Sequence, residues 1–249
     1  FHDCWAMSFD YGVDGGAIDI YADRSLIENN FIAYNTFTDC NGALEIGGSG
    51  GNTVNNTTLA YNKMVNNGSI LYVSNSGTFL TYTNNIQFYN NVIVESEAYR
   101  LVEPALFSFK SAPTAASSLV LKNNIIQLYG TIDVCRSQWG TAGALVHEDN
   151  IFKLGSGSVL NFTIAASELI TTSNSIFANT SAPNPLSWDF KPHASSPAID
   201  FGQVIAGLTR DFLGNPVPSS GVRDAGIIEA IVTGATLQVS SSATAIACN

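Results

Sequence analysis

The sequence predicts an all-β protein folded as a parallel β-helix, a solenoid with rungs of about 25–28 residues. Three observations predict this fold class: a polar turn position that recurs along the chain, short runs in which apolar residues alternate, and a composition poor in helix builders. Only 12% of the 249 residues are charged and 21 are glycine. Leucine, glutamate and lysine, which usually build surface helices, are scarce.

The recurring position lies in six related segments, "IAYNTF", "LAYNKM", "QFYNNV", "VLKNNI", "HEDNIF" and "TTSNSI". Successive positions are 25 to 33 residues apart, and such a period is typical of a solenoid. An asparagine side chain can satisfy turn backbone groups that would otherwise be buried without a partner, so we interpret these residues as turn formers and not as catalysts. They are Asn35, Asn62, Asn90, Asn123, Asp149 and Asn174.

Each unit carries short stretches in which every second residue is apolar, such as Ile18 and Ile20 or Leu44 and Ile46. Turn residues separate these stretches, and no unit contains an amphipathic stretch of helix length. Stacked coils of such strands pair each strand in parallel with its equivalent one repeat later, about 4.8 Å away. The apolar side chains then line a narrow core.

With these rungs, residues 1–180 resemble the right-handed parallel β-helix superfamily of pectate-lyase-like proteins. The resemblance implies a right-handed coil with a ladder of stacked asparagine amides inside it. Further on, "SSPAIDFG", "DFLGNP" and "DAGIIEA" resemble the closing segment of secreted bacterial β-helix proteins, which implies a C-terminal rung and cap over residues 181–230. The tail resembles the start of an immunoglobulin-like repeat of bacterial adhesins, so residues 231–249 are expected to be a linker or the start of the next module.

Charge and composition exclude several classes of function. The formal net charge of −10 and the pI near 4.5 disfavour a nucleic-acid partner, because phosphate would be repelled. No apolar run reaches the roughly 18–20 residues of a membrane-spanning helix, so no membrane insertion is expected. Phe1 already lies within the repeated text, and we expect N-terminal rungs before it in the parent protein. The resemblance implies an extracellular or cell-surface location.

The segments "GGAIDI" and "NGALEI" each place a carboxylate between two apolar residues. Because the side chains of a strand alternate, Asp19 and Glu45 must point outward when their apolar neighbours face the core. If the strands stack in register, the two carboxylates lie roughly 5 Å apart. Like charges this close repel each other, so one pKa should rise unless a cation or a hydrogen-bond donor intervenes.

Four interpretations of this pair stay open. Asp19 and Glu45 could be metal ligands for calcium, which prefers carboxylate oxygens; no other cofactor is expected. They could be catalytic, as acid and nucleophile or base on a glycosidic bond, since a separation of about 5–5.5 Å suits retention of configuration. Glu45 could bind substrate hydroxyls beside Tyr72, an aromatic platform in the next rung. Finally, both carboxylates could be solvated side chains on an exposed strand.

In the calcium-dependent β-helix lyases that the chain resembles, a Lys and an Arg on neighbouring rungs move the proton. Here the column of Asp19 and Glu45 contains no basic residue, and Lys63, Arg100 and Lys110 are expected elsewhere on the coils. We therefore expect a non-catalytic, adhesive or carbohydrate-binding module of a large bacterial cell-surface or secreted protein. Its expected partners are a polysaccharide or cell-surface glycan and the other modules of the same parent chain. The alternative is a polysaccharide lyase or glycoside hydrolase that uses this acidic face.

The chain opens with "FHDC", and "FTDC" follows at residues 37–40. Cys4 and Cys40 therefore occupy equivalent places in successive coils, where Cα atoms about 4.8 Å apart suit a disulfide. The alternative is a pair of buried thiols that stack as small apolar groups.

Overall fold

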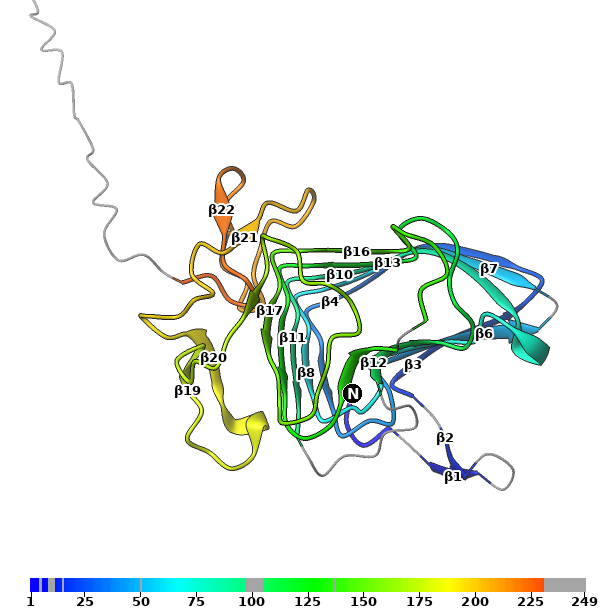
Figure 1. Cartoon of the computed structure of the whole chain (residues 1–249), viewed down its shortest axis with the longest axis horizontal. Coiled ribbons are helices and arrows are strands. Elements are labelled where there is room, and N and C mark those ends of the chain that lie inside the picture. Colours follow the sequence, from blue (N-terminus) through cyan, green and yellow to red (C-terminus); the bar gives the residue numbers. More distant parts are fainter. Residues whose placement is uncertain are drawn as a thin grey trace, which may run out of the picture.

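The computed structural model describes residues 1–4, 6–8, 12–14, 16–49, 51–96, 105–136 and 138–230. Within these residues the protein is nearly all-β, and stacked parallel strands form a β-solenoid of about five turns (Figure 1). The predicted fold class is therefore confirmed. No helix of this described part is long and apolar enough to cross a membrane. The predicted linker or module start at 231–249 lies outside the described residues.

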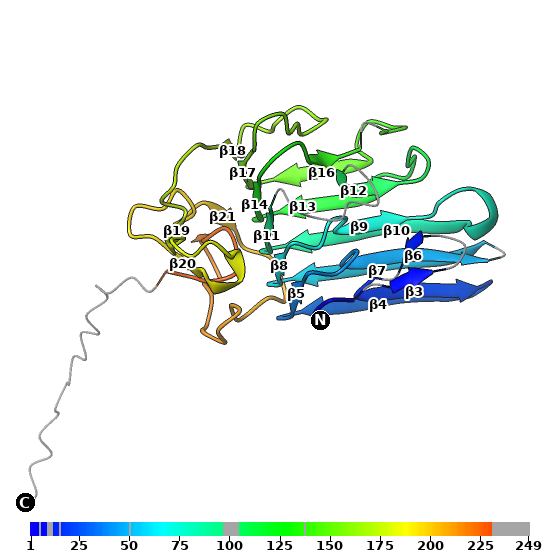
Figure 2. The same ribbon diagram turned by 90° about the horizontal axis from the view of Figure 1, so that it is seen from below.

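Each of five rungs contributes one strand to each of three parallel sheets, which stack along the solenoid axis (Figure 2), and one further strand extends the third sheet. The first sheet contains β3 (Ile18–Asp23), β6 (Leu44–Ser49), β9 (Leu71–Val73), β12 (Ala105–Phe109) and β15 (Asp133–Cys135). The second sheet contains β4 (Leu26–Ala33), β7 (Asn52–Ala60), β10 (Thr81–Tyr89), β13 (Leu119–Lys122) and β16 (Leu145–Glu148). The third sheet contains β5 (Thr36–Thr38), β8 (Lys63–Val65), β11 (Val92–Glu95), β14 (Ile125–Leu128), β17 (Ile151–Lys153) and β18 (Leu169–Ile170).

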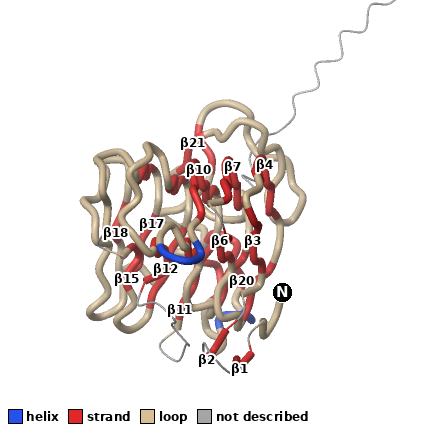
Figure 3. Tube along the Cα trace, turned by 90° about the vertical axis from the view of Figure 1, so that its right-hand side faces the viewer, coloured by secondary structure: helices blue, strands red, loops and turns tan. Residues whose placement is uncertain are grey.

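Several short elements lie outside these sheets, and Figure 3 shows how little of the described chain is helical. Pairing among the short strands is antiparallel, β1 with β2, β19 with β20 and β21 with β22. In chain order the elements are β1 (Ala6–Ser8), β2 (Gly12–Asp14), the 3-10 helix η1 (Gly77–Phe79), β19 (Phe177–Asn179), the 3-10 helix η2 (Pro185–Ser187), β20 (Asp189–Pro192), β21 (Gly202–Gln203) and β22 (Val222–Arg223).

The register predicted for the first two rungs is confirmed. Ile18 pairs with Leu44, and Ile20 pairs with Ile46, across β3 and β6. The inward side chains of the three sheets meet in a narrow core, where the rings of Phe88 and Phe107 pack edge to face at 5.0 Å. Alternation along each strand therefore divides the residues into an apolar inside and a variable outside.

A ladder of asparagine amides runs along the turn between the second and third sheets. The side-chain Nδ2 of each asparagine donates to the Oδ1 of the next at 2.9 to 3.2 Å. The backbone N–H of the same residue donates to that Oδ1 as well, so the buried turn is satisfied. The ladder ends at Glu168, whose Oε1 accepts from the last amide at 2.7 Å. Its members are Asn35, Asn62, Asn91, Asn124 and Asn150.

The predicted ladder positions were wrong by one residue in the later rungs. Asn90 and Asn123 directly precede the ladder and have a left-handed backbone, with φ of +53° and +57°. Asp149 occupies the equivalent place with φ of +54°, and Asn174 accepts from the ammonium of Lys153 instead of joining the ladder. The ladder spacings of 27, 29, 33 and 26 residues lie within the 25–33 residues that separate the repeated segments, and two of them exceed the predicted rung length of about 25–28 residues.

Residues 176–230, which we call the C-terminal segment, add no further strand to the three sheets. They pack sideways on the outer face of the third sheet, as β19 to β22 show in Figure 1, and cover Val65, Val94 and Ile125. The Nδ2 of Asn90 donates to the carbonyl oxygens of Asp224 and Gly226 at 3.1 and 3.2 Å. A rung and cap at the end of the solenoid were predicted for residues 181–230. The C-terminal segment instead lies beside the third sheet, because burial of the apolar side chains on that outer face stabilises this position.

The end of the core after the fifth rung is covered by other residues. Leu160 belongs to the core cluster, and Phe162 packs against it. His147 lies on β16 with its ring 4.5 Å from that of Phe162 and its Nδ1 2.7 Å from Oε2 of the buried Glu168. His147 is therefore a half-buried residue that packs on Phe162 at the end of the solenoid.

Candidate functional site

Asp19, Glu45 and Tyr72 form one column on the outer face of the first sheet. The strands pair Asp19 with Glu45 and Glu45 with Tyr72, so the predicted stacking of these residues is confirmed. Asp19 is exposed, and the other two are half-buried. Ser108 of β12 pairs with Tyr72 and continues the column as a buried residue. The two carboxylates therefore sit one strand spacing apart, about 4.8 Å at Cα. We call this the acidic column.

A second column lies beside the acidic column on the same face. Tyr21 follows Asp19 by two residues on β3 and pairs with Gly47 of β6. Its ring lies over Gly47, where an added β-carbon would be 3.4 Å from the ring. The Tyr21 side chain is 56% exposed, and its ring meets that of Phe79 edge to face at 6.1 Å. The missing side chain of Gly47 thus leaves room for an accessible aromatic ring.

The second column, which we call the tyrosine column, continues through Ser74 to Lys110. The Ser74 Cβ lies 3.8 Å from the β-carbon position of Gly47. Lys110 donates its backbone N–H to the carbonyl of Val73 at 2.9 Å, which places it beside Ser74 in the next rung. Lys110 is exposed, and its Nζ lies 3.3 Å from the β-carbon position of Gly77. A basic side chain therefore shares this face with the two carboxylates.

Sequence reasoning found the acidic column and missed the tyrosine column. The alternation that sends Asp19 outward also sends Tyr21 outward in "IDIY", so the signal was present. Lys110 was harder to place, because Asn75 and its partner Ser111 are 36 residues apart, well beyond the predicted period. As predicted, the acidic column contains no basic residue among the described residues, since Ser108 follows Tyr72; Lys110 lies one column away on the same face.

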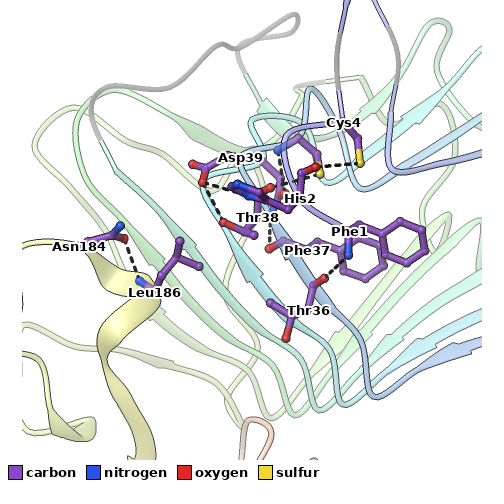
Figure 4. A network of polar contacts seen from close by, with 11 residues as sticks. Phe1, His2, Cys4, Thr36, Phe37, Thr38, Asp39, Asn184 and Leu186 are labelled. Atoms are coloured by element: carbon purple, nitrogen blue, oxygen red, sulfur yellow. Dashed lines mark hydrogen bonds and ion pairs between the residues drawn. The ribbon is translucent and has the colours of Figure 1, made fainter.

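Cys4 and Cys40 lie at the predicted equivalent places, and of the two alternatives the disulfide is contradicted, because both are free thiols, with Cys40 buried and Cys4 half-buried. The N–H of Asn41 donates to the Cys4 carbonyl at 3.1 Å, which joins the two coils. The Cys4 thiol donates to the His2 carbonyl at 3.6 Å (Figure 4), and the Cys40 thiol donates to the Thr38 carbonyl at 3.3 Å. Burial raises the pKa of the Cys40 thiol to about 11, which keeps it protonated.

The metal and catalytic roles of Asp19 and Glu45 stay predictions. Among the described residues, no group of three or more His, Cys, Asp or Glu side chains is arranged to hold a metal ion. Calcium at this pair would therefore need further oxygen ligands from backbone carbonyls or solvent. Acid–base work on a glycosidic bond would use the same two carboxylates at the strand spacing.

No protein-family model matches this chain, and no curated protein sequence matches it either. The class that the structure defines is a parallel β-helix with a laterally packed C-terminal segment. What the protein binds or transforms is inferred from the outer face of the first sheet.

Proposed function

We propose that this chain is a carbohydrate-binding β-helix module of a bacterial cell-surface or secreted protein, and that the outer face of the first sheet binds the glycan. The observation that supports this most is the ring of Tyr21, which is 56% exposed and lies over Gly47 beside the acidic column. Sugar recognition combines an aromatic face with polar groups that accept hydroxyl hydrogen bonds. Tyr21, Asp19 and Glu45 offer both on one surface.

The two columns also run along the solenoid axis and cross several rungs. A linear glycan lying in this direction would meet Asp19, Glu45 and Tyr72 on one side and Tyr21 and Lys110 on the other. The carboxylates suit hydroxyl donors, whereas the Lys110 ammonium suits a carboxylate or sulfate substituent. The proposal therefore includes polysaccharides with both neutral and acidic groups.

The test is affinity electrophoresis of the full chain in gels that contain xylan, dextran or polygalacturonate. We expect at least one of these to retard the protein, and Tyr21→Ala to weaken that retardation roughly tenfold, because the stacking contact is lost. Tyr82→Ala is the matched control, since Tyr82 is 57% exposed but lies on β10 of the second sheet. Retardation by none of the three glycans, or equal loss in both variants, would contradict the proposal.

A second candidate function is a polysaccharide lyase or glycoside hydrolase at the same face. The in-register carboxylates of Asp19 and Glu45 favour it, together with Lys110 one column away. The electrophoresis glycans can be recovered after prolonged incubation and their chain lengths compared with controls. Shorter chains would support the enzyme, and unchanged lengths with retained binding would support the non-catalytic module. We also propose that the other modules of the same parent chain are partners of this module.

A further inference from the structure

The connection between the first and second sheets is longer in the third rung than in the two rungs before it. Residues 24–25 join β3 to β4 and residues 50–51 join β6 to β7, whereas residues 74–80 join β9 to β10. We call residues 74–80 the η1 loop. No residue of η1 is buried, and η1 packs against β6 of the preceding rung (Figure 1). Surface loops held on a rigid scaffold often carry binding residues.

Phe79 brings the η1 loop to the tyrosine column. Its ring meets the ring of Tyr21 edge to face, with 6.1 Å between the ring centroids and 61° between the ring planes. Phe79 is half-buried, and it belongs to neither apolar core cluster of the described residues. The packing of Phe79 on Tyr21 is therefore a contact of the candidate site and not of the core.

The η1 loop is anchored to the fourth rung near its other end. The Nδ2 of Asn75 donates to the Ser111 carbonyl, and the Ser111 N–H donates to Asn75 Oδ1, both at 2.7 Å. Beside this anchor, Lys110 Nζ lies 3.3 Å from the β-carbon position of Gly77, whose φ is +76°. Glycine at this position permits both the left-handed backbone and the close approach of the ammonium. The η1 loop therefore lies against both Tyr21 and Lys110.

These contacts restrict the ring of Tyr21. One face of the ring lies over Gly47, and the edge of the ring meets Phe79. A tyrosine on an exposed strand could otherwise turn between staggered rotamers. A side chain that is already held in its binding orientation loses less conformational entropy when a ligand binds.

We propose that Phe79 is a positioning residue of the glycan site and acts through Tyr21. It holds the Tyr21 ring so that the exposed face of the ring is oriented to stack on a sugar ring. This inference rests on the proposed function and adds to it a residue that increases affinity without touching the glycan.

The first test is a double-mutant cycle, measured by affinity electrophoresis of the full chain in a glycan that retards the wild type. We expect Phe79→Ala to weaken retardation about threefold to fivefold, less than Tyr21→Ala, because the tyrosine ring remains but is no longer held. In the Tyr21→Ala background, Phe79→Ala should have no further effect. A further loss in that background, or no loss in Phe79→Ala alone, would overturn the proposal.

Two variants control this cycle. Phe79→Tyr keeps the edge-to-face ring and should bind like the wild type, which a smaller side chain cannot do. Thr78→Ala changes an exposed residue of η1 next to Phe79 and should leave binding unchanged. Failure of Phe79→Tyr to bind, or an equal loss in Thr78→Ala, would show that the loop and not the ring pair matters, and would overturn the proposal.

The second test needs no glycan and observes the Tyr21 ring by nuclear magnetic resonance of the full chain with labelled tyrosine. The Tyr21 signals are assigned by their loss in Tyr21→Ala. An aromatic ring shifts the resonances of protons packed against it, so Phe79→Ala should move these signals and Thr78→Ala should not. Unchanged signals in Phe79→Ala would overturn the proposal. If no glycan retards the wild type, the proposed function is contradicted and this inference with it, whereas moved signals with unchanged binding of Phe79→Ala would contradict this inference alone.

Discussion

The first and third sheets have the same backbone arrangement of stacked parallel strands, but their outer faces differ in solvent exposure. On the third sheet the outward residues Val65, Val94 and Ile125 are buried beneath the C-terminal segment. On the first sheet Tyr21 and Lys110 remain accessible. Because stacked rungs satisfy the backbone equally on every face, the outward side chains alone decide which face is covered and which is left for a ligand.

Asn91 belongs to the ladder inside the turn, whereas the adjacent Asn90 bonds to the C-terminal segment on the covered face. Substitutions at these two residues therefore test the inside and the covered face separately. Asn91→Ala removes a ladder amide that bonds to Asn124, to the Leu59 carbonyl and to the turn of Asn62. We expect it to lower the free energy of unfolding by about 3 kcal/mol or more, since buried groups lose their partners. Chemical denaturation of the full chain measures this.

Asn90→Gly is the matched comparison, because glycine tolerates the left-handed backbone at φ of +53° and the change then removes only the bonds that hold the C-terminal segment and the neighbouring amide of Asn123. It should cost less and should make the C-terminal segment more sensitive to limited proteolysis. An equal decrease in the free energy of unfolding for the two variants would contradict the expectation that the ladder contributes more to stability than the contacts of the covered face.

Gly226 tests the fit of the C-terminal segment on the third sheet. Its φ is +88°, and a β-carbon there would lie 2.7 Å from Cδ1 of Ile125. Gly226→Ala should therefore lower the free energy of unfolding by roughly 2 kcal/mol, from strain and from the clash. Gly214→Ala is the control, because Gly214 has φ of +84° with nothing within 4 Å. A cost in Gly214→Ala as large as in Gly226→Ala would show that strain alone matters.

The two faces also hold carboxylates differently, since Asp19 is exposed whereas Glu95, at the end of β11, is fully buried. Burial raises the pKa of Glu95 to about 8, although it accepts from the N–H groups of Asn67 and Gly68. The folded state then holds the proton more tightly than the unfolded state, so stability falls as the pH rises from about 5 to about 8.

From pH 6 to pH 7 this fall should be at most about 1.4 kcal/mol. Glu95→Gln cannot titrate and should show a shallower fall in denaturation experiments at the two values. The difference between the two proteins isolates Glu95 from Glu229, whose pKa burial also raises, to about 7. Parallel pH profiles would contradict the assignment.

Alternation predicted the strand register, because the core accepts only one side of each strand. The existence of an asparagine ladder was predicted, but Asn90 and Asn123 were chosen where Asn91 and Asn124 are its members. Both residues of an asparagine doublet suit a turn, and only packing decides which of them faces inward. The covered face also left a signal in the sequence. Val92, Ile93 and Val94 form an unbroken apolar run, and such runs indicate a strand that is buried on both faces.

The candidate site divides in the same way. Asp19, Glu45 and Tyr72 follow from one repeat of the chain, so the sequence predicted their column. The place of Lys110 depends on the number of residues in the connection that precedes β12, and no local sequence pattern predicts that number.

The path of the C-terminal segment changes how the solenoid should unfold. Stacked repeats usually interact only with their nearest neighbours, so end repeats can fray while the middle persists. Here one stretch of chain bonds to Tyr34 in the first rung, Asn90 in the third, Asn123 in the fourth and Glu148 in the fifth. Loss of either end would release contacts along the whole length, so this short repeat array should melt in a single cooperative transition.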